Sequence, residues 1–92
     1  MSARDSLNNF EVGARLRVLR EMLQLGKMEM ADEHGIDRTN YGRMEAGTRR
    51  LPIEIGYRLA ERCHVTLDWL YRGRWDHLTL EMAERLRKVG NG

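Results

Sequence analysis

The sequence predicts a small all-α domain of five helices, followed by a short sixth helix near the C-terminus. A chain of 92 residues is enough for one domain with one modest core. It contains a single proline and few runs of β-branched residues, which favours helices over strands. Apolar residues recur at helical spacing, and capping residues or glycines separate these segments. With 41% hydrophobic and 33% charged residues, the chain is expected to be globular rather than disordered.

The first helix is expected to begin near Asn8 or Asn9. Asn8 followed by Glu11 has the spacing of a capping box, in which two backbone N–H groups are satisfied by side chains. The apolar face then continues at steps of four, three and four, through Val12, Leu16, Leu19 and Leu23.

Two short helices joined by a tight turn come next. The first spans 27–34 and should stop at Gly35, which readily adopts the left-handed conformation. Asp37 is a good N-cap for the second, which spans 38–46 and should end at Gly47. Two short helices separated by a few residues that include glycine are typical of a helix-turn-helix.

Three further helices complete the predicted domain. Pro52 suits the first turn of a fourth helix, and His64 is expected to end that helix in the left-handed conformation. Thr66 is a plausible N-cap for a fifth helix that closes at Gly73, and 80–88 should form the sixth. The apolar face of the fourth helix consists of Ile55, Leu59, Ala60 and Cys63.

The expected organisation is a flexible leader over 1–8, a helix-turn-helix domain over 9–73 and a helical extension over 74–92. The net charge of +2 is too mild to indicate a nucleic-acid partner by itself. A single cysteine, Cys63, excludes an intramolecular disulfide and fits a reducing compartment. No signal peptide or apolar stretch of membrane-spanning length is evident. We therefore expect a cytoplasmic protein that does not contact a membrane.

The region 12–73 resembles the DNA-binding domain of lambda/434-type repressors, the Cro/C1 or XRE-type helix-turn-helix family. The resemblance rests on LRVLR in the first helix, Ala31-x-x-x-Gly35-Ile36 at the turn, RMEAG at 43–47 and LAERCHVTLDWLYRG at 59–73. The order and spacing of these segments support the resemblance more than any single segment does. It implies a five-helix domain that binds double-stranded DNA.

The resemblance places the outer side of the third helix in the major groove. Arg38 and Arg43 can each donate two hydrogen bonds to guanine O6 and N7. Thr39 offers a hydroxyl or a methyl contact, and Asn40 can pair with adenine or a phosphate. The alternative is that both arginines are ordinary solvated residues, but the helix-turn-helix context favours DNA contact.

Phosphate contacts are expected at Lys27, Arg49 and Arg50. Lys27 starts the second helix, where the family commonly has a glutamine that touches a phosphate. From the third helix to Arg50 there are four arginines and one glutamate, a local charge of +3. The resemblance also implies a partly buried ion pair between Arg20 and Glu45, which would fix the third helix on the first.

Three residues depart from the family's usual pattern. Tyr41 replaces an aliphatic core residue, so its hydroxyl must reach the surface or a partner. Gly42 lowers the stability of the third helix by roughly 1 kcal/mol relative to alanine. Gly26 stands where a serine or threonine cap is usual.

The resemblance implies a sequence-specific transcriptional regulator, a repressor that binds a palindromic operator as a homodimer. The dimer surface is expected on the fifth helix and 78–86. The alternative is an antitoxin or phage-type adaptor whose C-terminal segment binds a partner protein. That segment would present Trp75, Leu78, Leu80, Met82 and Leu86.

An enzyme is not expected, because no nucleophile–base pair, phosphate-binding glycine loop or metal-ligand set is evident. No cofactor is expected either. Cys63 and His64 are adjacent and lack the paired spacing of a zinc site, and His34 is expected to be a semi-buried histidine rather than a ligand.

Overall fold

The computed structural model describes the backbone of residues 7–91 and the side chains of residues 7–90. Most of the predicted leader therefore lies outside the described residues. The described chain forms six helices and no strand, which confirms the all-α prediction. The helices are α1 (Asn9–Met22), α2 (Lys27–Glu33), α3 (Arg38–Ala46), α4 (Ile53–Cys63), α5 (Leu67–Arg72) and α6 (Leu80–Asn91).

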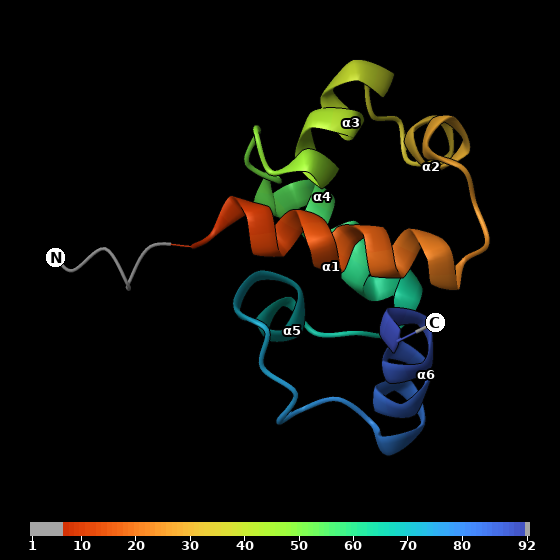
Figure 1. The fold of residues 1–92 in the computed structure, drawn as a ribbon, viewed down its shortest axis with the longest axis vertical. Helices are drawn as coiled ribbons and strands as arrows, with labels where there is room; N and C mark the ends of the chain where they lie inside the picture. The colour runs from red at the N-terminus through yellow and green to blue at the C-terminus, as the bar shows by residue number, and fades with distance from the viewer. Residues whose placement is uncertain (1–6, 92) are drawn as a thin grey trace, which may run out of the picture.

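Helix α1 crosses the middle of the molecule (Figure 1). The pair α2 and α3 lies on one side of it, and α5 and α6 lie on the other. Helix α1 contacts α3, α5 and α6 directly. The helix-turn-helix pair is thus held at one end of the molecule, away from α6.

Local capping chemistry sets the start of three helices as the sequence predicts. Asn8, Asp37 and Thr66 are the N-caps of α1, α3 and α5, and each side-chain oxygen accepts a backbone N–H at 2.9 Å. Such a cap contributes about 1 kcal/mol, because it satisfies a donor that the helix itself leaves unpaired.

Left-handed residues end three helices, also as predicted. His64 ends α4 with φ of 58°, and Gly73 ends α5. Gly47 ends α3 with φ of 82°, and a Cβ there would lie 2.6 Å from the Cα of Phe10. Both the backbone conformation and the close approach of α1 therefore require glycine at position 47.

Three predicted boundaries were wrong by a few residues. Helix α2 ends at Glu33, with His34 as its C-cap, so the histidine lies just outside the helix. Pro52 is the N-cap of α4 rather than a residue of its first turn, because its ψ of 145° is extended. Helix α6 continues to Asn91, three residues past the expected Lys88.

All six helices contribute to one hydrophobic core. Ile36 and Met44 are buried beneath α3, and Ala31 is fully buried on α2. The face of α6 that carries Met82 and Leu86 also packs into this core. Within residues 7–91, no helix combines the length and apolar character needed to cross a membrane.

Candidate nucleic-acid interface

The turn between α2 and α3 is tight because its backbone hydrogen bonds back onto α2. The amide of Ile36 donates to the carbonyl of Ala31 at 2.8 Å, and Gly35 between them has φ of 66°. The side chain of Ile36 is then directed into the core. This local geometry fixes α3 relative to α2.

Helices α1 and α3 cross at backbone contact. A Cβ built on Gly13 of α1 would lie 2.5 Å from the carbonyl oxygens of both Met44 and Glu45. Only a residue without a side chain allows α3 to come this close. The sequence analysis missed Gly13, because a glycine within an amphipathic helix does not by itself reveal a close crossing.

A buried polar network joins α3 to α1 beside this crossing. Arg20 donates to both carboxylate oxygens of Glu45, from Nε at 2.6 Å and from Nη2 at 3.2 Å, and a third donor, Nη1, reaches the carbonyl of Leu25. The hydroxyl of Tyr41 donates to Oε2 of Glu45 at 2.6 Å. The side chains of Arg20 and Glu45 are only 14% and 5% exposed. The sequence predicts that the Tyr41 hydroxyl must reach the surface or a partner. Its partner is Glu45, one turn further along the same helix.

Arg20 is charged and Tyr41 is neutral at neutral pH. The hydrogen bond to Glu45 raises the pKa of Arg20 further above its usual value. Burial, together with the neighbouring carboxylate, raises the pKa of Tyr41 well above its usual value. The network thus consists of a paired cation and anion with a neutral phenol, and each group is hydrogen-bonded.

The outer side of α3 is polar and accessible. Thr39 and Arg43 are exposed, and Asn40 is half-buried near the start of the helix. Among the described residues, Arg43 forms no ion pair. These side chains project from a helix whose opposite face, with Tyr41 and Met44, is buried.

Arg38 is exposed but already engaged with a carboxylate. Its Nε lies 3.0 Å from Oδ1 of Asp32 and its Nη2 lies 2.7 Å from Oδ2, across the turn between α2 and α3. The hydrogen bonds from Arg38 lower the pKa of the Asp32 carboxyl. The sequence analysis did not foresee this pair, since the two residues are six apart and belong to different helices.

The three residues predicted to contact phosphates are all exposed. Lys27 is the first residue of α2, and Arg49 and Arg50 follow α3. Lys27 and Arg17 of α1 together line a hollow of about 430 Å³ that also borders Gly42 on α3. Arg17, which was not singled out from the sequence, lines the same hollow and is paired with Glu21 at 3.5 Å.

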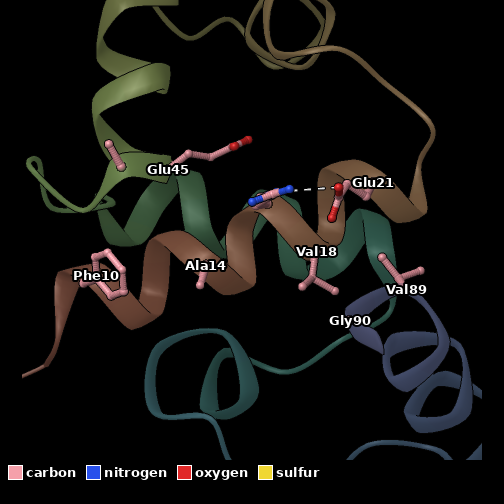
Figure 2. Close-up of a pocket in the computed structure, with 9 residues that line it drawn as sticks. Phe10, Ala14, Val18, Glu21, Glu45, Val89 and Gly90 are labelled. Carbon is pink, nitrogen blue, oxygen red and sulfur yellow. Dashed lines mark ion pairs between the residues drawn. The ribbon is translucent and has the colours of Figure 1, made fainter. Parts of the chain in front are cut away.

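An adjoining groove of about 470 Å³ runs along α1 and shares Arg17, Glu45 and Ala46 with this hollow (Figure 2). Phe10, Ala14 and Val18 line one side of it, with Val89 of α6 at the far end (Figure 2). Its two carboxylates, on Glu21 and Glu45, are each paired with an arginine, and its lining includes no histidine, cysteine or serine. The groove therefore offers no nucleophile–base pair.

The residues that could suggest a metal site are dispersed. In the part of the chain that the structure describes, no three histidine, cysteine or acidic side chains are grouped closely enough to hold a metal. His34 is half-buried, with Nδ1 2.7 Å from the carbonyl of Met30 and Nε2 accepting a hydrogen bond from Arg62. Burial raises the pKa of the Cys63 thiol, which lies in the core.

Comparison with known families agrees with this geometry. The model of a helix-turn-helix domain family matches residues 13–74, well over half of the chain. The chain belongs to the lambda-repressor-like helix-turn-helix family. The resemblance stated from the sequence is thereby confirmed. No curated protein and no solved structure matched the chain.

Membership of this family identifies α2 and α3 as the DNA-binding element of a transcription regulator. Members of the family are typically not enzymes. The network of Arg20, Glu45 and Tyr41 supports the inner side of α3 in this helix-turn-helix protein, and the predicted base contacts lie on its outer side.

Proposed function

We propose that this helix-turn-helix protein is a sequence-specific repressor that binds a palindromic operator as a homodimer, with one α3 in the major groove of each half-site. The observation that carries this proposal is the contrast between the two sides of α3. The inner side is fixed through Glu45 to Arg20, whereas Thr39 and Arg43 on the outer side are exposed. A rigidly held helix with exposed donors is suited to reading base edges.

We assign base contact to Arg38, Thr39, Asn40 and Arg43. Each arginine presents a planar set of donors that fits guanine O6 and N7, and the threonine and asparagine can serve neighbouring bases or phosphates. Lys27, Arg49 and Arg50 contact phosphates on either side of the groove. Their contacts supply affinity and register without reading sequence.

We place the contact between the two copies of the homodimer on an apolar surface that α4 and α5 share. Ile53 and Tyr57 are 53% and 56% exposed, and with Leu67 they border two adjoining hollows. Large apolar side chains gathered at one place on a surface favour a protein contact. By contrast, Met82 and Leu86 of the segment 78–86 are buried in the core of their own chain, so these two side chains are not available to a second copy.

Selection of bound sequences from a randomised duplex pool, at one stated salt concentration, tests DNA reading. The wild type should enrich a palindrome with half-sites about 34 Å apart, one helical turn. Arg43→Ala should lose the preference at one base pair of each half-site. Arg85→Ala removes the same charge from α6, at the far end of the molecule, and should keep the full motif. Equal loss of base preference in Arg43→Ala and Arg85→Ala would contradict base reading by α3.

Sedimentation tests the dimer surface. Tyr57→Glu should shift the protein toward monomer and weaken operator binding, because a charge would be buried in an apolar contact. Leu80→Glu on α6 is the matched control, since Leu80 is 73% exposed. Dissociation by Leu80→Glu instead would move the homodimer interface to the C-terminal segment.

A promoter–reporter pair that carries the selected operator distinguishes repression from activation. Expression should fall when the protein is present and recover with Arg43→Ala. An increase with the wild type would replace the repressor assignment with an activator.

A further inference from the structure

We propose that Asp32 is a positioning residue that holds the Arg38 guanidinium in the orientation for reading a guanine, so that the two residues act as one unit. This inference rests on the proposed function, since it assigns a base class to one position of the operator. It starts from the pair that bridges α2 and α3, with Nε–Oδ1 at 3.0 Å and Nη2–Oδ2 at 2.7 Å.

The pair leaves the correct edge of the guanidinium available. An arginine has five N–H donors, and Asp32 occupies the one on Nε and one of the two on Nη2. Of the three donors that remain, two lie along the edge formed by Nη1 and Nη2. Two parallel donors on one edge match the O6 and N7 acceptors of guanine in the major groove. Adenine presents a donor in place of O6, so the same edge would discriminate against it.

Within residues 7–90, the one further hydrogen bond of the Arg38 guanidinium is weak. The Nη1 of Arg38 lies 3.5 Å from the sulfur of Met28, a thioether whose side chain is 60% exposed. A thioether is a poor acceptor compared with a base oxygen or nitrogen. Met28 can therefore be displaced when DNA binds.

The exposure of the pair points to a role in binding rather than in folding. The side chains of Arg38 and Asp32 are 58% and 52% exposed, and an ion pair that exposed adds little to stability in the free protein. Next to DNA the pair loses water, so the hydrogen bonds that orient Arg38 strengthen. A carboxylate near DNA also repels phosphates, which opposes binding to every sequence equally. Positioning therefore predicts that loss of the Asp32 carboxylate lowers sequence discrimination, whereas repulsion alone predicts that discrimination stays the same.

Asp32→Asn tests which effect dominates. Affinity is measured at fixed salt for the selected operator, for operators with each guanine replaced, and for unrelated duplex. We expect discrimination at one guanine to fall roughly tenfold, within the range that one bidentate contact supplies. Binding to unrelated duplex should stay the same or tighten, and the melting temperature should be unchanged. In an Arg38→Ala background, Asp32→Asn should cause no further loss at that guanine.

Glu33→Gln is the matched control. It removes the same charge from the same helix, and Glu33 pairs with Arg62 of α4 rather than with α3. It should leave discrimination at the guanine intact.

Five results would overturn the inference. Equal tightening of operator and unrelated duplex by Asp32→Asn would show that Asp32 only repels DNA. A lower melting temperature with parallel loss of both affinities would show a structural role. Loss at a base other than guanine in Arg38→Ala would remove the base assignment. A wild type without any sequence preference would overturn the proposed function as well. If Asp32→Asn leaves discrimination at every guanine unchanged, only this inference is overturned.

Discussion

Replacing Gly13 with alanine should displace α3 from α1. The new Cβ would lie 2.5 Å from two carbonyl oxygens of α3, a separation that packed carbon and oxygen atoms do not tolerate. Both obstructing atoms belong to the backbone, so no side chain can rotate away. Helix α3 must move off α1 or shift along it, and the hydrogen bonds between Arg20 and Glu45 must stretch.

The magnitude follows from comparison with Gly42, which lies on the open side of α3. A Cβ at Gly42 meets nothing within 4 Å, so Gly42→Ala should gain only helix propensity, about 1 kcal/mol. Gly13→Ala gains the same propensity but suffers overpacking, which typically costs 1–3 kcal/mol and here meets rigid backbone. We expect a net loss of about 2 kcal/mol, or a fall of roughly 8–16 °C in melting temperature for a domain of this size.

Thermal and urea unfolding of the two variants is the assay. Gly42→Ala should melt above the wild type and Gly13→Ala well below it. Operator affinity of Gly13→Ala, measured at a temperature where it is fully folded, should also fall, because α3 is displaced. A melting temperature of Gly13→Ala equal to or above that of Gly42→Ala would refute the close crossing of α1 and α3.

Four further predictions concern single side chains. Glu45→Gln should lower the free energy of unfolding by roughly 3 kcal/mol in urea titration, because the largely buried Arg20 would lose its negatively charged partner. A loss below about 1 kcal/mol would contradict the network. Tyr71→Phe removes a hydroxyl shared between two backbone carbonyls ahead of α4, and should cost about 1–2 kcal/mol in the same assay. Burial raises the pKa of the Cys63 thiol, so a disulfide reagent at pH 8 should react slowly until the protein unfolds; rapid labelling of the native protein would refute its burial. The folded pKa of Asp32 is lowered below its usual 3.8 by Arg38, so the contribution of this pair is present above pH 3.8 and is lost as the pH falls through the lower folded value. Titration by NMR should show the pKa return toward 3.8 in Arg38→Met.

The helix boundaries could be predicted because they depend on local chemistry. Asn8, Asp37 and Thr66 act within three residues of their own positions, which the sequence displays directly. The end of α6 could not be fixed this way, because nothing in the sequence after Lys88 separates a helix from a frayed tail. The error at Pro52 is of the same kind, since a proline fits both the N-cap and the first turn.

The contacts between helices were less predictable. Gly13 and Gly42 both lie inside helices, yet one is pressed against carbonyl oxygens and the other faces open space. Only the packing of α1 on α3 distinguishes them. The pairing of Arg38 with Asp32 likewise depends on the angle of the turn rather than on residue spacing. The side chains that lie between helices are therefore where sequence reasoning falls short.

The two ends of α3 are held by different means, and this bears on how the protein reads DNA. The C-terminal half is fixed by buried contacts, where Gly13 packs on Met44 and Glu45 binds Arg20. The N-terminal end, which we propose to enter the major groove, is held within the described residues by an N-cap and by the exposed pair of Arg38 with an aspartate. Changes at the buried end should therefore alter stability and affinity together, whereas changes at the exposed end should alter sequence preference with little effect on stability. A DNA-binding protein built this way can change its preferred sequence through residues that do not endanger its fold.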